Sequence, residues 1–142
     1  MTLVRDCPCS GQSMTLFTAP WILLTLYGED GRHGYELAKI VKGHMEKMGV
    51  SLNTTGLYRH LRSLEKRGML RSAWETPDKG QAKRRYFITE DGKYCLWTWI
   101  GTLRTQFDLM VRFFEEAQNL FPDATFPGKA SETDGRSAMK EM

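Results

Sequence analysis

The sequence is poor in cysteine, with three residues among 142, and three thiols cannot all pair with one another in disulfides. It has no apolar run near the roughly 20 residues that span a bilayer. Residues 1–10 carry charges and two cysteines, which is unlike a secretory signal. We therefore expect one cytoplasmic domain with reduced thiols, and neither a disulfide scaffold nor an integral membrane protein.

Catalytic patterns are also lacking. The sequence shows no Ser/His/Asp set, no paired carboxylates and no glycine loop that would cradle a phosphate. We therefore expect no enzymatic activity and no cofactor.

Positive charge is present but unevenly placed. The net charge is only +3, yet residues 32–85 hold 13 Lys/Arg against 5 Asp/Glu, a net of +8. The segments on either side are acidic, at −2 for residues 1–31 and −3 for residues 86–142. A basic middle between acidic flanks favours a polyanionic partner, although solvated helix faces would leave the same composition.

Hydrophobic spacing predicts a mainly α fold with a small β-hairpin. Apolar residues at helical spacing indicate three helices, after which two short segments alternate around a turn that contains Pro77, Asp78 and Gly80. A long helix follows from Thr89, whose hydroxyl can cap it, to about Phe121. The expected order is an irregular arm (1–17), a winged helix-turn-helix (18–90), a dimerisation helix (91–121) and a disordered tail (122–142).

The long helix carries a heptad seam. Apolar residues step by four and three for more than three repeats, a pattern typical of helices that pair with a partner. We therefore expect a homodimer whose interface contains Leu96, Ile100, Leu103, Phe107, Met110, Phe114 and Phe121.

The order of three helices, hairpin and long helix is that of a winged helix-turn-helix, in which one helix enters the DNA major groove. Three segments in register, 33–37 (HGYEL), 56–70 (GLYRHLRSLEKRGML) and 83–92 (KRRYFITEDG), resemble the PadR family of bacterial transcriptional regulators. The resemblance implies a dimeric repressor that binds double-stranded DNA. Its two subunits would pair through their C-terminal helices. With the local charge, it indicates as DNA contacts Thr54, Thr55, Tyr58, Arg59, Arg62, Lys79, Lys83, Arg84 and Arg85. Arg85 could instead pair with Glu65 or Glu90, and Tyr35 and Tyr86 are expected in the core.

The signal that releases such a repressor is less defined. Trp97 and Trp99 could stack on a small aromatic effector, since some members of the family bind flat compounds between subunits, although ordinary packing would also use them. No metal is expected, but Cys7, Cys9 and Cys95 could form a thiol or metal sensor. A protein-interaction module is a further alternative, although it gives no reason for cations to gather on the third helix and wing.

Overall fold

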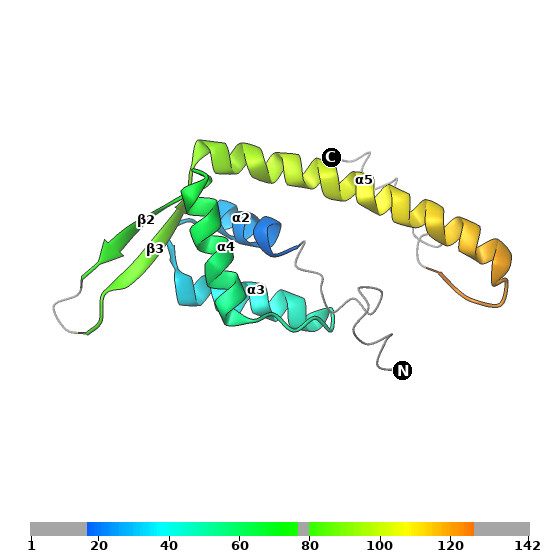
Figure 1. The fold of residues 1–142 in the computed structure, drawn as a ribbon, viewed down its shortest axis with the longest axis horizontal. Coiled ribbons are helices and arrows are strands. Elements are labelled where there is room, and N and C mark those ends of the chain that lie inside the picture. The colour runs from blue at the N-terminus through cyan, green and yellow to red at the C-terminus, as the bar shows by residue number, and fades with distance from the viewer. Residues whose placement is uncertain (1–16, 77–79, 127–142) are drawn as a thin grey trace. The chain divides into compact units, whose positions relative to one another are not determined.

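The computed structural model describes residues 17–76 and 80–126. Its elements are α2 (Thr18–Gly28), β1 (Arg32–His33), α3 (Gly34–Lys47), α4 (Thr54–Lys66), β2 (Leu70–Glu75), β3 (Lys83–Ile88) and α5 (Glu90–Leu120) (Figure 1). The strands form one antiparallel sheet in the order β1-β3-β2. This arrangement confirms the predicted winged-helix fold.

The core forms around α2, which is apolar on most sides. Ile22, Leu23 and Leu26 of α2 are fully buried, and α3 and α4 each add three apolar side chains at helical spacing. The sheet and the start of α5 close the core with Leu70, Tyr86, Ile88 and Leu96. Burial of Tyr86 agrees with the sequence expectation. Tyr35 does not, because this side chain at the start of α3 is 54% exposed.

Strand β1 is the element that the sequence did not indicate. It is only two residues long, and its residues Arg32 and His33 pair with Tyr86 and Arg85 of β3. A strand of this length has no hydrophobic period, so it forms only because β3 lies beside it.

The junction of the sheet and α5 is tightly packed. Thr89 caps the helix as predicted, since its hydroxyl accepts a hydrogen bond from the Gly92 amide at 3.0 Å and donates one to the Gly68 carbonyl at 2.6 Å. A Cβ on Gly92 would lie 2.1 Å from the Met69 carbonyl oxygen. The helix can begin here only because residue 92 has no side chain.

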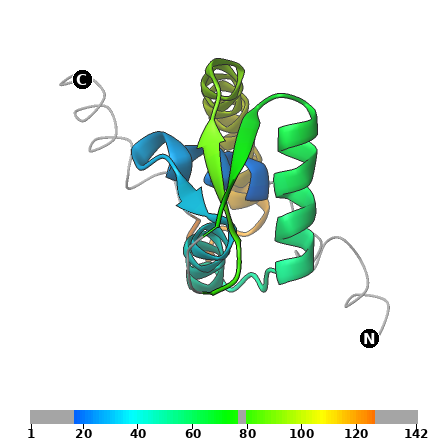
Figure 2. The ribbon, with the colours of Figure 1, turned by 90° about the vertical axis from the view of Figure 1, so that its left-hand side faces the viewer.

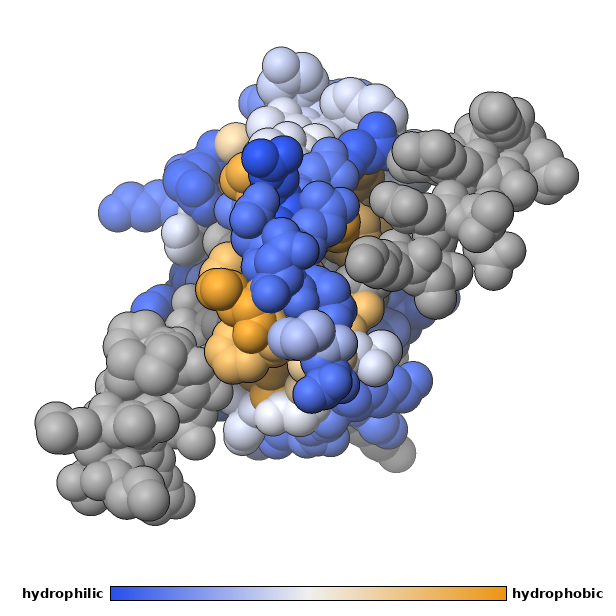
Figure 3. Space-filling view, turned by 90° about the vertical axis from the view of Figure 1, so that its right-hand side faces the viewer, coloured by the Kyte–Doolittle hydropathy of each residue, from blue (hydrophilic) through white to orange (hydrophobic). Residues whose placement is uncertain are grey.

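The chain divides between Trp99 and Ile100 into two compact units. In the first unit Leu96 is 5% exposed and packs in the core, so this seam position is already covered within the protomer. In the second unit the seam residues Ile100, Phe107 and Met110 are exposed. Figure 3 shows hydrophobic side chains at the molecular surface.

Several sequence expectations lie outside the described residues. These are the arm with Cys7 and Cys9, apart from its last residue, the hairpin tip with Lys79, and the predicted tail from residue 127 onward. Within the described residues, no helix is both long and apolar enough to span a bilayer. The same residues contain no group of three His, Cys, Asp or Glu side chains arranged to hold a metal ion.

Candidate nucleic-acid interface

Helix α4 separates a buried stripe from a polar face. Leu57, Leu61 and Leu64 are at most 1% exposed and fix the helix against the core. The Asn53 side chain caps it, accepting a hydrogen bond from the Thr55 amide at 2.9 Å. The residues that remain exposed include Thr54, Thr55, Arg59 and Arg62. These threonines and arginines are the ones that the sequence indicates as DNA contacts.

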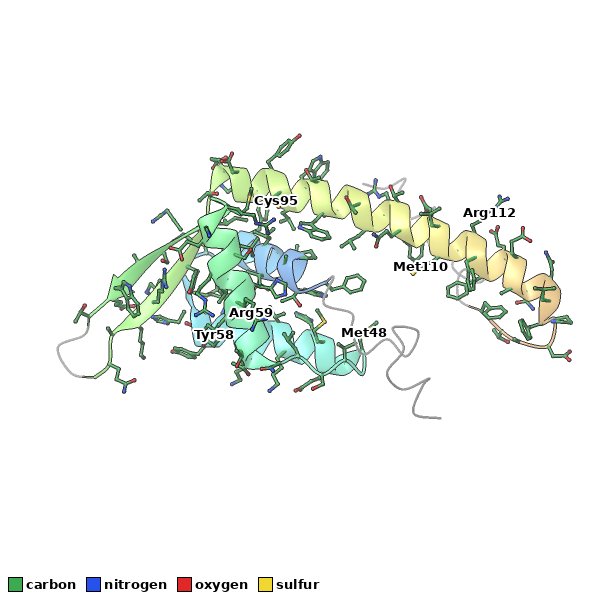
Figure 4. The ribbon with its side chains drawn as sticks, in the orientation of Figure 1. Met48, Tyr58, Arg59, Cys95, Met110 and Arg112 are labelled. Carbon is green, nitrogen blue, oxygen red and sulfur yellow. The ribbon has the colours of Figure 1, made fainter. Side chains whose placement is uncertain are left out.

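Tyr58 lies on the same helix (Figure 4), and its side chain is half-buried. Its ring packs against the start of α3, where a Cβ on Gly34 would lie 3.0 Å from the ring. A side chain at Gly34 would therefore push Tyr58 outward. Neighbouring His60 is partly buried, and this burial lowers the pKa of its imidazole, with a smaller contribution from the positive charge of Arg59. The lowered pKa favours the neutral form of this imidazole.

The β2–β3 hairpin lies beside α4 (Figure 2) and is joined to it by ionic contacts. Arg84 donates from Nη2 to Glu65 Oε2 at 2.7 Å and from Nε to Ser72 Oγ at 2.8 Å. Ser72 in turn donates to Glu65. Because Glu65 belongs to α4, this network ties the wing to the helix, and it neutralises the Arg84 guanidinium within the protein.

Arg85 is held in a second network on the hairpin. It donates from Nε to Glu75 Oε2 at 2.6 Å and from Nη1 to the Gly31 carbonyl at 2.7 Å. His33 Nε2 lies 2.9 Å from the same Glu75 oxygen, while His33 Nδ1 lies 2.7 Å from Glu36 Oε1. Arg85 and His33 lower the pKa of Glu75 to about 2, with the Arg85 hydrogen bond as the main cause.

The partner of Arg85 is therefore Glu75, and neither of the two acids considered from the sequence. Glu65 pairs instead with Arg84. Both arginines, which the resemblance assigns to DNA contact, are thus ion-paired within the protein, Arg84 with α4 and Arg85 within the wing. Lys83 is exposed on the same strand, and its Nζ lies 5.6 Å from the centre of the Tyr35 ring.

A groove of about 440 Å³ lies between α4, the start of α3 and the hairpin. We call it the helix–wing groove. Its lining residues are His33, Gly34, Tyr35, Tyr58, Arg62, Trp74, Gln81, Ala82, Lys83, Arg84 and Tyr86. They combine four tyrosine and tryptophan rings with three Arg and Lys side chains, and none of these described lining residues is a carboxylate. The groove can therefore accept an anionic group beside flat apolar surfaces.

Two of these lining residues were not predicted from the sequence to be functional. Trp74 reads as an ordinary strand residue, yet it is 66% exposed. Tyr35 reads as a core residue, yet it faces the groove. Neither position could be assigned without knowing how the hairpin folds over α3 and α4.

The predicted effector tryptophans lie in different surroundings. Trp97 is 72% exposed, whereas Trp99 packs partly buried against the core of the first unit, as does Cys95. Of the three cysteines, only Cys95 lies in the described residues, where it is a free thiol.

Comparison with known proteins agrees with this geometry. Residues 22–97 match the profile of the "Transcriptional regulator PadR-like family". A crystal structure of a candidate transcriptional regulator from Thermoplasma acidophilum is 27% identical, with a TM-score of 0.58, over 70% of this chain and 91% of that chain. A PadR family transcriptional regulator from Eggerthella lenta is 22% identical, with a TM-score of 0.59, over 80% of this chain and 97% of that one.

A transcriptional regulator from Clostridium thermocellum is also 22% identical, with a TM-score of 0.59, over 68% of this chain and 89% of that one. At this identity the last two structures support the fold alone. No curated protein matches the sequence.

Proposed function

Because the chain belongs to the PadR-like family of transcriptional regulators, we propose that it is a homodimeric repressor that binds a pseudo-palindromic DNA operator. The observation that carries the proposal is the exposed face of α4. Arg59 and Arg62 remain open to solvent while the leucines on the opposite side anchor the helix. This activity would be exerted in the cytoplasm, where a prokaryotic regulator meets the chromosome.

The chemistry of α4 suits the major groove. That groove is about 12 Å wide and admits a helix, and an arginine can donate two hydrogen bonds to one guanine. Thr54 and Thr55 stand at the N-terminus of α4, where backbone amides favour a phosphate. Lys83 on the wing would neutralise a backbone phosphate, which sets the register on the duplex without reading sequence.

DNA binding can be tested by fluorescence anisotropy with a duplex from the region upstream of the chain's own gene and a scrambled duplex for comparison. We expect Arg59→Ala and Arg62→Ala each to weaken operator binding by about 1–3 kcal/mol. Arg112→Ala on α5 removes the same charge from an exposed site and is the matched control (Figure 4). Wild-type affinity in the Arg59→Ala, Arg62→Ala double variant would refute the assignment of α4.

Dimerisation is proposed from the second unit. The seam residues Ile100, Phe107 and Met110 are 37%, 57% and 47% exposed on one helix, and burying such side chains stabilises an interface. The heptad spacing indicates that the partner is the same helix of a second copy of this protein. Two recognition helices related by a twofold axis would then match two half-sites about one helical turn apart.

Release from DNA is proposed to follow binding of a small aromatic effector near Trp97. This ring is exposed on α5, directly after the buried Leu96 and two residues before Trp99, which packs on the core. A ligand there would act on the helix that joins the DNA-binding unit to the proposed dimer seam. It can shift the equilibrium only by its difference in affinity for the two dimer arrangements.

A further inference from the structure

Two exposed aromatic rings stand in the helix–wing groove and are held in place. Trp74 is 66% exposed, and the Arg84 guanidinium carbon lies 5.5 Å from the centre of its ring. Tyr35 is 54% exposed and stacks on His33 with 5.4 Å between the ring centres. Rings that are ordered by their neighbours and open to solvent form a prepared contact surface, because little further freedom is lost when a ligand covers them.

The cations of the groove fall into two classes. Arg84 is neutralised by Glu65, at 2.7 Å. Arg62 and Lys83 form no ion pair with any of the described residues. Two positive side chains therefore remain available to an anion, one from α4 and one from β3, and both line the same groove as the aromatic rings.

We propose that the helix–wing groove binds the sugar–phosphate backbone of one DNA strand, with phosphates on Arg62 and Lys83 and sugars against Trp74 and Tyr35. This inference rests on the proposed function and assigns a new role to both aromatic residues. If α4 enters the major groove and the hairpin reaches the adjacent minor groove, the strand that separates the two grooves must pass between them. The helix–wing groove lies at that position.

The ion-paired Arg84 has a structural role and is not proposed to contact a phosphate. Arg84 is a positioning residue, because its guanidinium is bonded to Glu65 and Ser72 and lies against the Trp74 ring. It holds the indole toward the groove and offers no free charge to a phosphate. The contact made by Trp74 is consequently apolar, whereas the contact made by Lys83 is electrostatic.

This difference gives the test. The probe is the operator duplex, or any duplex that the wild type binds at low salt, titrated at several salt concentrations. Lys83→Ala should lower the slope of log affinity against log salt by about 0.9, the value for one lost phosphate contact. Trp74→Ala should weaken binding about tenfold, the scale of one buried aromatic contact, and leave the slope unchanged. Tyr35→Ala should also weaken binding and leave the salt slope unchanged.

Matched variants keep the result interpretable. Trp74→Phe retains a ring and should bind nearly as well as the wild type, while the quenching of Trp74 fluorescence by DNA disappears. Trp21, which stacks on His44 away from the groove, serves as the control through Trp21→Phe, which should retain the quenching. Because Trp74 is exposed, Trp74→Ala should keep the wild-type melting temperature.

Two negative results separate the two proposals. If Arg59→Ala weakens DNA binding but Trp74→Ala and Tyr35→Ala bind as the wild type does, the groove does not hold the backbone and the proposed function stands. If the wild-type protein binds neither duplex at low salt, the proposed function fails and this inference fails with it.

Discussion

The Nε atom of Arg85 donates a hydrogen bond to Glu75 Oε2 at 2.6 Å and thereby joins β3 to β2 in the wing. The same carboxylate oxygen lies 2.9 Å from Nε2 of His33 in β1, so one acidic side chain connects all three strands of the sheet. This oxygen holds its two partners only while the carboxylate is ionised, which makes the geometry of the wing dependent on pH.

The pKa of Glu75 is lowered from 4.5 to about 2 in the folded protein. A carboxyl with a depressed folded pKa stabilises the fold fully above its unfolded pKa, and this stabilisation is lost as pH falls through the folded value. We therefore expect Glu75→Gln to have a lower melting temperature than the wild type near neutral pH, with the difference shrinking between about pH 5 and pH 2.

Thermal unfolding followed by circular dichroism across this range measures that difference. Glu46→Gln is the matched control, because Glu46 is exposed and forms no ion pair with the described residues. A difference between wild type and Glu75→Gln that stays constant from pH 6 to pH 2 would contradict the assigned role of the ion pair.

Gly92→Ala should destabilise the first unit. The new methyl group would lie 2.1 Å from the Met69 carbonyl oxygen, so the start of α5 must move away from the sheet. Overpacking of this kind destabilises proteins by about 1–3 kcal/mol. In Gly43→Ala, the matched control inside α3, the methyl group meets nothing within 4 Å, and higher helix propensity should raise stability by up to about 1 kcal/mol. Denaturant unfolding would show opposite shifts, and equal shifts would contradict the packing argument.

Charge on the proposed dimer seam should produce monomers. Phe107 and Met110 are exposed in the protomer, so Phe107→Glu and Met110→Glu should leave its fold intact while placing a buried charge in the interface. Sedimentation equilibrium reports the change in mass. Thr105→Glu adds the same charge at an exposed position off the seam and should remain dimeric. An unchanged dimer in the double variant would remove α5 from the interface.

An effector near Trp97 should be visible in tryptophan fluorescence. We expect flat aromatic compounds to change the emission in a saturable way in the wild type and much less in Trp97→Phe. The same compounds should weaken operator binding, and a tenfold release corresponds to about 1.4 kcal/mol of coupling. Trp21→Phe serves as the control, since that ring stacks on His44 with 4.1 Å between the ring centres. Compounds that bind at Trp97 without changing operator affinity would show that the site is not regulatory.

The sequence predictions that the structure confirms all rest on local patterns. The leucine stripe of α4 and the capping hydroxyl of Thr89 depend on residues within one or two turns of each other. Strand pairing of 70–75 with 83–88 follows from a short connection between alternating segments. Such features are determined by spacing and by backbone chemistry, so the sequence by itself determined the helices, the hairpin and the winged-helix order.

The contacts that shape the candidate interface are decided by tertiary structure. Glu65 and Arg84 are 19 positions apart, and His33 and Glu75 are 42 apart, so neither pair follows from a local period. Two arginines side by side on β3 have several possible acidic partners in the sequence, and only the packing of the hairpin on α3 and α4 selects among them. The same packing places Tyr35 and Trp74 in one groove, because side chains from distant segments become neighbours only when the core beneath them is closed.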